Sequence, residues 1–238
     1  MVLTYVMYDA ARGLVRGGAP VAIDHARNIA TLERSVGLLR EADVQRVVGH
    51  VPGIEAVFGF GYDVLHLGVT GGVLLWLFFR HPDAYARVRT ILLAATGLAL
   101  VGFTVFPSAP PRLVAIGIAD TLSLANDTAH SGVLRLLYNP YAAMPSLHAA
   151  YAVIAGACLY HWGRHRVIRF IGITYPIFVA VEVVATGNHF FFDLVAGIVI
   201  DACALAFASR VLDRHAGREI TQETGSVPRF SVLSEPEV

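Results

Sequence analysis

The sequence predicts an all-α membrane protein whose helices cross the bilayer several times. Of its 238 residues, 55% are hydrophobic and only 15% are charged, whereas a soluble domain usually carries about 25% charged residues. The mean hydropathy is +0.60. The chain also contains several apolar segments close to the roughly 20 residues that a helix needs to cross a bilayer. These observations exclude a disordered protein and argue against an ordinary soluble globule.

Five of these segments are expected to form transmembrane helices. Four are clearly apolar, and the remaining one begins with the pair Pro145 and Ser146. In chain order the segments are 60–79, 90–106, 142–160, 167–187 and 190–209. We therefore expect a polytopic membrane helix bundle.

The N-terminal segment 2–15 is apolar but short, and Asp9 and Arg12 interrupt it. We interpret it as a sixth span; an interfacial helix or the remainder of a longer helix are the alternatives. It does not resemble a cleavable signal, because no charged region precedes the apolar run and no clear small-residue cleavage site follows it.

Residues 25–48 mix apolar and charged side chains in a helical pattern. Ile29, Leu32, Val36 and Leu39 recur at helical spacing among acidic and basic residues. This pattern is typical of an amphipathic helix that lies on the membrane surface. We therefore expect one interfacial helix before the first strong span.

The organisation of the chain follows from these segments. We expect a short membrane or interfacial segment over 1–24, a membrane domain over 25–212, and a cytoplasmic tail over 213–238. From 217 onward the tail contains Ser, Thr, Glu and Pro without periodicity, which predicts disorder.

The composition excludes several classes of function. All 18 basic side chains are arginine, so mechanisms that need a lysine, such as a Schiff base or a P-loop, are excluded. The formal net charge is zero, which gives no electrostatic basis for a nucleic-acid partner. Cys158 and Cys203 lie in apolar stretches without metal-site spacing, and we interpret them as packing residues.

The distribution of arginine predicts the orientation, because short cytoplasmic loops carry an excess of positive charge. Three arginine-rich regions are expected inside: 80–89, 163–169 and the start of the tail at Arg210. The connection 107–141 and the turn around Asn188 hold few arginines and are expected outside. We therefore expect an integral protein of the plasma membrane.

Polar residues at the outer ends of the spans form one candidate site. His189 and Asp193 are spaced i and i+4 at the start of a helix, so the carboxylate can accept one imidazole N–H and leave the other nitrogen as a nucleophile. Ser146, with the first-turn amides of its helix, is suited to binding an anion. Arg112 follows a proline-rich run and can hold phosphate oxygens. His148 would then protonate the leaving oxygen.

The sequence resembles the type 2 phosphatidic acid phosphatase superfamily, and within it the branch of inositol phosphorylceramide synthases. The resemblance rests on YAAMPSLH at 141–148, TGNHFFFD at 186–193 and PPR at 110–112. It implies a six-helix membrane core and chemistry without a metal or another cofactor. It also implies a phosphohistidine on His189 that Asp193 orients, His148 as acid and later base, and phosphate held by Ser146 and Arg112.

Two cationic positions of the superfamily's pattern are different here. Val105 stands where the first motif usually has Lys, and Glu182 and Val183 stand where the third motif usually has Ser and Arg. Arg135, in the outer connection, is the best candidate for a substitute phosphate ligand. The alternatives are that Arg135 is a solvated surface residue, that another arginine takes this part, or that the site works with less charge neutralisation. The departures favour phosphotransfer without excluding a simple phosphatase.

The predicted function is that of a lipid phosphotransferase or phosphatase. The substrate would be a phosphorylated lipid in the bilayer, and the acceptor would be water or a polyol such as inositol. A non-enzymatic transporter or scaffold that only binds anions at the outer cluster is the alternative. A vanadate-dependent oxidase is disfavoured by the missing cations and by the membrane setting.

Overall fold

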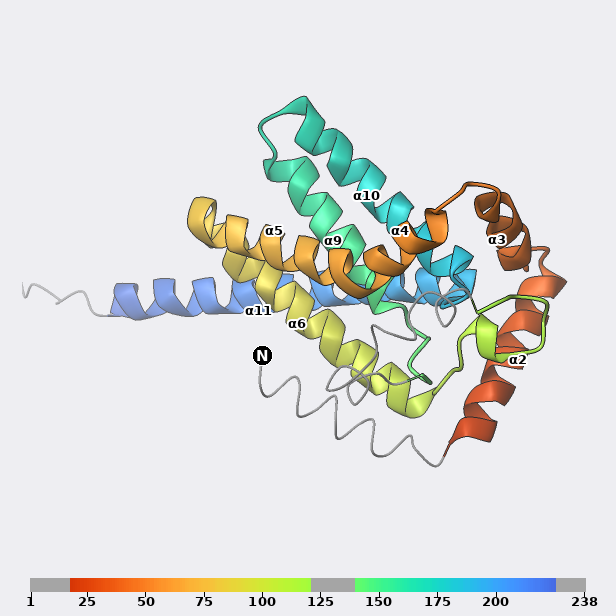
Figure 1. Ribbon diagram of the computed structural model, residues 1–238. Helices are drawn as coiled ribbons and strands as arrows, with labels where there is room; N and C mark the ends of the chain where they lie inside the picture. Colours follow the sequence, from red (N-terminus) through yellow and green to blue (C-terminus); the bar gives the residue numbers. More distant parts are fainter. Residues whose placement is uncertain (1–17, 121–139, 226–238) are drawn as a thin grey trace, which may run out of the picture.

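The computed structural model describes residues 18–120 and 140–225. Within these ranges the secondary structure is helical, and the one β feature is an isolated bridge between Ser108 and Ala142. The predicted all-α class is therefore confirmed. Figure 1 shows long helices packed side by side, with shorter helices gathered at one end.

Helix α9 (Leu147–Trp162) lies at the centre of the bundle. It packs against α10 (Arg166–Ala185), α11 (Phe191–Gly225), α6 (Pro82–Val105) and α5 (His66–Arg80). Small side chains line it, and Gly156 lies so close to α10 that an added Cβ would come within 2.5 Å of the carbonyl oxygen of Gly172. Small residues at such crossings let helix backbones approach closely inside a membrane.

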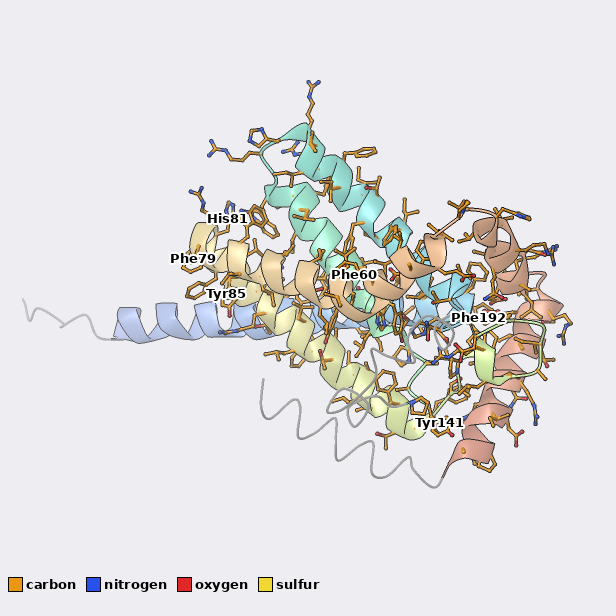
Figure 2. The ribbon with its side chains drawn as sticks, viewed as in Figure 1. Phe60, Phe79, His81, Tyr85, Tyr141 and Phe192 are labelled. Carbon is orange, nitrogen blue, oxygen red and sulfur yellow. The ribbon has the colours of Figure 1, made fainter. Side chains whose placement is uncertain are left out.

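Three of the described helices are long and apolar enough to cross a membrane, namely α6, α10 and the part of α11 up to Arg210. Helices α5 and α9, with 15 and 16 residues, are shorter. Many large apolar side chains on the outside of the bundle are exposed, among them Phe60 at 59% and Phe79 at 69%; Figure 2 shows both. Such a surface fits contact with lipid tails.

The helix boundaries differ from the predicted spans where prolines and caps decide them. Helix α6 begins at Pro82, because proline suits the first helical turn, so Arg87 and Arg89 belong to the helix and not to a loop. Helix α9 begins only at Leu147, after Pro145 and the N-cap Ser146.

The segment before α5 is also helical. Helix α4 (Ile54–Phe60) continues into a π-helical turn, η1 (Gly61–Leu65), and then into α5. The predicted span 60–79 is therefore the second part of a longer helical stretch. The π turn lies against α10, where the carboxyl group of Glu182 contacts Gly61.

The single amphipathic helix expected over 25–48 is two helices, α2 (Ala19–Ser35) and α3 (Glu41–Gly49). The chain turns between them at Gly37, whose φ is 73°. The face of α2 that carries Ala22, Ala26, Ile29, Ala30 and Glu33 is buried against the bundle, whereas Leu32 of the predicted apolar stripe is 54% exposed. Glu41 at the start of α3 is fully buried as well. These helices therefore cover the end of the bundle through specific contacts.

The arginine-rich turns lie together at one end of the bundle. A hollow there is lined by Arg80, Arg164 and His165, and the rings of His81 and Trp162 are 6.4 Å apart. In Figure 2, His81 and Tyr85 lie at this end, whereas Tyr141 and Phe192 lie at the other.

The N-terminal segment 2–15 and the end of the tail from 226 onward lie outside the described residues. Helix α11 continues to Gly225, beyond residue 212, where the membrane domain was expected to end, and beyond residue 217, where disorder was expected to begin. Helix α2 starts at Ala19, before the expected start of that domain at residue 25. The division into three regions stays a prediction.

Candidate active site

Two extended loops bring the motif residues to the end of the bundle opposite the arginine-rich turns. Ser108 bridges Ala142 in parallel, and the amide of Ala143 donates to the carbonyl of Ser108 over 3.1 Å. The proline-rich connection after α6 is thereby fastened to the loop before α9. The amide of Ala109 donates to the carbonyl of Ala22, which attaches α2 to the same loops.

His189 and Asp193 form the pair that their spacing predicts. Nδ1 of His189 lies 3.3 Å from Oδ2 of Asp193, and both side chains are buried. The same carboxylate oxygen accepts the amide N–H of Phe190 over 2.9 Å. Nε2 of His189 is buried without a hydrogen-bond partner among the described residues. With Nδ1–H donated to Asp193, Nε2 carries the lone pair of a nucleophile.

Ser146 connects the starts of α9 and α11. Its amide donates to the carbonyl of Asp193 over 2.9 Å, and its hydroxyl oxygen accepts the amide of Ala149 as the N-cap of α9. Gly197 makes this contact possible, since an added Cβ would come within 2.4 Å of the carbonyl oxygen of Ser146. The first turn of α9, which favours anions, therefore lies next to the His189 and Asp193 pair.

His148 lies between His189 and two further rings. The ring centroids of His148 and His189 are 5.7 Å apart. On the other side, the rings of Tyr62 and His66 lie 4.2 Å and 4.4 Å from that of His148. The sequence analysis did not include Tyr62 or His66 among the site residues. The available signal in the sequence was their spacing, because a histidine four residues after a tyrosine lies on the same face of a helix.

Arg112 is positioned by the turn that precedes His189. Its amide donates to the carbonyl of Gly187 over 3.1 Å, and its guanidinium hydrogen-bonds to Oδ1 of Asn188. Gly187 has a φ of 69° and lies against the Cβ of Arg112, so a side chain there would push the loop away. Nε of Arg112 also lies 3.5 Å from Oδ2 of Asp120. Sequence reasoning treated Asn188 mainly as a turn residue and missed this contact.

Glu33 and Glu41 lie behind the site. Oε1 of Glu33 accepts the amide N–H of Phe192 over 2.7 Å, and Oε1 of Glu41 accepts that of Phe191 over 3.4 Å. Burial, together with the neighbouring carboxyl group of Glu41, raises the pKa of Glu33 to about 9. A signal was present, because Glu33 continues the buried stripe of Ala26 and Ile29 at the i+4 spacing.

The predicted site residues thus converge, with one outside the described part of the chain. Arg112, Ser146, His148, His189 and Asp193 come together. Arg135 lies in 121–139, outside the described residues. Neither of the two positions that lack the usual cation brings a charge to the site. Val105 is 74% exposed at the end of α6, and Val183 is fully buried.

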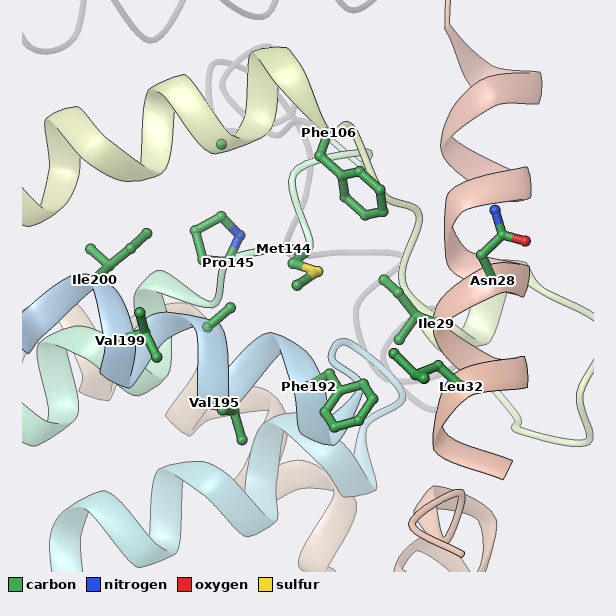
Figure 3. A pocket seen from close by; sticks show the side chains of 12 residues that line it. Asn28, Ile29, Leu32, Phe106, Met144, Pro145, Phe192, Val195, Val199 and Ile200 are labelled. Carbon is green, nitrogen blue, oxygen red and sulfur yellow. The ribbon is translucent and has the colours of Figure 1, made fainter. Parts of the chain in front are cut away.

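An apolar groove of about 670 Å³ begins beside the site and runs along α11 between α6 and α2. Figure 3 shows its side chains, which include Pro145 next to Ser146 and Phe192 next to Asp193. The groove continues to Val199 and Ile200, two turns further along α11. A ligand with a polar end at the site and a long apolar part can therefore lie in it.

Known proteins share this sequence pattern and this fold. The family model of the PAP2 superfamily matches residues 27–207, and the chain belongs to that superfamily. A crystal structure of LpxE from Aquifex aeolicus has a similar fold, with a TM-score of 0.51 and 20% sequence identity over 71% of this chain and 93% of LpxE. No curated protein matches the sequence. The family, the fold and the three long apolar helices support an integral membrane protein of the PAP2 superfamily.

Proposed function

We propose, from this membership of the PAP2 superfamily, that the protein transfers a phosphoryl group from a phosphorylated lipid through a phosphohistidine on His189. One observation carries the proposal: Nδ1 of His189 faces Asp193, while Nε2 is buried without a partner among the described residues, beside His148. A buried imidazole oriented by a carboxylate is an activated nucleophile.

The first step forms a bond between Nε2 of His189 and phosphorus and breaks the bond from phosphorus to the lipid oxygen. Protonated His148 gives its proton to that oxygen, and the lipid alcohol leaves. In the second step, neutral His148 takes a proton from water or an alcohol, whose oxygen attacks phosphorus and breaks the bond to His189. Arg112 and Ser146, with the first turn of α9, hold the phosphoryl oxygens. Arg135 stays a candidate further ligand.

The apolar groove supports a lipid as the substrate. It begins at Pro145 and Phe192, each next to a site residue, and it runs along a helix apolar enough to span the membrane. The acceptor can be water or a polyol such as inositol, since both need the same base. The likeness to inositol phosphorylceramide synthases in the motifs favours the polyol.

The decisive experiment incubates the purified protein in detergent with a panel of lipid phosphates, with and without inositol. We expect inorganic phosphate if water is the acceptor and a phosphoinositol product if inositol is. A short reaction with radiolabelled substrate should trap an acid-labile, alkali-stable phosphoprotein that His189→Ala does not form. No turnover across the panel would instead support the anion-binding transporter or scaffold.

We further propose that the site opens on the extracytoplasmic side of the plasma membrane. The three arginine-rich turns lie together at the opposite end of the bundle, and such ends are retained in the cytoplasm. The test compares His50→Cys with His165→Cys, two exposed positions at opposite ends, with Cys203 replaced by Ser. An impermeant thiol reagent should label only the first in intact cells. The reverse labelling would place the site in the cytoplasm.

A further inference from the structure

The arginine-rich end of the bundle, opposite the candidate active site, has a hollow of its own. It lies between the turn that joins α5 to α6 and the turn that joins α9 to α10, and its volume is about 200 Å³. This arginine hollow is lined by two arginines, two histidines and two tryptophans, namely Trp76, Arg80, His81, Trp162, Arg164 and His165. The whole sequence contains only two tryptophans, so both of them lie at this hollow.

Contacts within the two turns hold the walls of the arginine hollow in place. The ring of His81 meets that of Trp76 edge-on at 5.3 Å and lies 6.4 Å from that of Trp162, so these rings connect α5 with α9. In the other turn, Nε of Arg169 donates to the carbonyl of Gly163 over 3.0 Å. An added Cβ on Gly163 would come within 2.3 Å of a backbone oxygen of α9. Both turns are therefore tightly packed, and the hollow has fixed walls.

Positive charge collects around the arginine hollow with little acid to balance it. The stretches 80–89 and 163–169 contain six arginines and one acidic residue, Asp83, which is exposed. Among the described residues, neither Arg80 nor Arg164 forms an ion pair with a carboxyl group. Helices α6 and α10 also begin here without a capping side chain, so their first-turn amides add partial positive charge. The hollow is therefore suited to an anion.

The surroundings of the arginine hollow favour a lipid headgroup over a free anion. Phe79 is 69% exposed, and Val167, one residue before the lining residue Ile168, is 68% exposed. Figure 2 shows Phe79 and His81 at the same end of the bundle. Tryptophan side chains prefer the headgroup level of a bilayer, which is the depth of the lipid phosphates. A lipid whose headgroup lies in the hollow can therefore pack its acyl chains on these apolar side chains.

We propose that the arginine hollow binds the headgroup of an anionic phospholipid, with Arg80 and Arg164 on its phosphate oxygens. A guanidinium presents N–H donors that match two phosphate oxygens at once. Basic pockets between transmembrane helices on the cytoplasmic side bind anionic headgroups. In the orientation proposed above, the lipid belongs to the cytoplasmic leaflet. It is not the substrate, since the hollow lies at the end of the bundle opposite His189.

The two tryptophans give a direct test, because their fluorescence reports on this hollow alone. The purified protein is reconstituted in vesicles of phosphatidylcholine and phosphatidylglycerol, with bromine on the acyl chains of one lipid or the other, close to the headgroup. Bromine quenches tryptophan fluorescence only at short range, so the two quenching curves give the lipid preference of the hollow. Because one arginine near an anionic headgroup favours it by about fivefold, we expect the parent to prefer phosphatidylglycerol about tenfold and the double variant Arg80→Ala, Arg164→Ala less than about twofold.

The matched control is Arg166→Ala, which removes an exposed arginine from the same turn that does not line the hollow. It should keep most of the preference. An equal loss in Arg166→Ala and Arg164→Ala would show that diffuse surface charge attracts the lipid and would overturn the proposal. Equal quenching by the two lipids in the parent would overturn it as well. Arg80→Ala and Arg164→Ala should each lose part of the preference, so the single variants decide the test if the double variant does not fold.

An excess of inorganic phosphate distinguishes a lipid headgroup from a free anion. Compared with sodium chloride at the same ionic strength, we expect phosphate to leave the preference for phosphatidylglycerol unchanged. Loss of the preference with phosphate alone would show that the hollow takes a free phosphate, and the assignment to a lipid would be wrong. The quenching needs no turnover, so a failure of the proposed function would leave its outcome unaffected.

Discussion

Carboxyl groups accept hydrogen bonds from the first turn of α11 on two of its faces, and their roles differ. On one face, Asp193 accepts the amide of Phe190 and faces Nδ1 of His189. On the other face, Glu33 and Glu41 accept the next two amides of the turn. All three groups satisfy donors that a helix start leaves unpaired.

The difference lies in the second partner of each carboxyl group. Asp193 faces Nδ1 of His189, and the other ring nitrogen, Nε2, lies in the site. The carboxylate can therefore affect the reactivity of Nε2. Glu33 lies beside a second carboxyl group, and burial together with that group raises the pKa of Glu33 to about 9. Glu33 therefore attaches α2 to α11 in its neutral form. The comparison teaches that the second partner of a carboxyl group at a helix start decides what it can do: Asp193 can orient the proposed nucleophile, whereas Glu33 docks a helix.

The largest effect is expected on the catalytic face. His189→Ala removes the proposed nucleophile and should lower turnover of a lipid phosphate by about 10⁶, as loss of a catalytic nucleophile does, while thermal unfolding in detergent stays close to that of the parent. Initial rates on the purified variant measure this. Activity within about tenfold of the parent would assign the nucleophile elsewhere.

A smaller loss is expected for the carboxylate on the same face. Asp193→Asn removes the orientation of His189 and the stabilisation of its charged form but keeps the nucleophile, so turnover should fall by roughly 10⁴. Rates for the two variants under identical conditions compare them. If Asp193→Asn lost as much as His189→Ala, the carboxylate would be needed for more than orientation.

Arg112→Ala should lower turnover about a hundredfold or more, or about 3 kcal/mol, because in the proposed mechanism Arg112 stabilises the charge that develops on the phosphoryl oxygens. Arg112→Lys should recover only part of the loss, since a point charge lacks the two-pronged contact. Vanadate inhibition should weaken in parallel. Arg46→Ala, which removes an exposed arginine from α3, is the matched control and should leave both values unchanged.

The smallest effect is expected on the docking face, and it depends on pH. Because the pKa of Glu33 is raised to about 9 in the folded protein, its contribution to stability is complete below the unfolded value and is lost as the pH rises through about 9. Between pH 5 and 9 the Tm of the parent should fall. Glu33→Gln, which stays neutral, should flatten this part of the profile. If the Tm of the two proteins changed with pH in parallel, the pKa of Glu33 would not be raised in the folded protein, and the prediction would be wrong.

The sequence predicted the parts of the site whose partners lie close by in the chain. His189 and Asp193 share a helix face because of their spacing, and Ser146 begins a helix because a proline precedes it. Arg112 was predicted because three prolines shape its loop. These are local rules, and the structure places the four residues together. The role of Arg135, which lies in 121–139 outside the described residues, remains a prediction.

What the sequence by itself determined is the all-α membrane class and the identity of the motif residues, because hydropathy and i to i+4 spacing are properties of short segments. Only the tertiary structure decided that Glu33 docks against α11, that Asn188 holds Arg112, and that a π turn meets His148. Those contacts join residues about 75 to 160 positions apart in the chain, and the packing of the helices brings them together. The position of Glu33 on the buried face of its helix is a signal of burial, but the sequence alone does not show which backbone donors a buried glutamate meets.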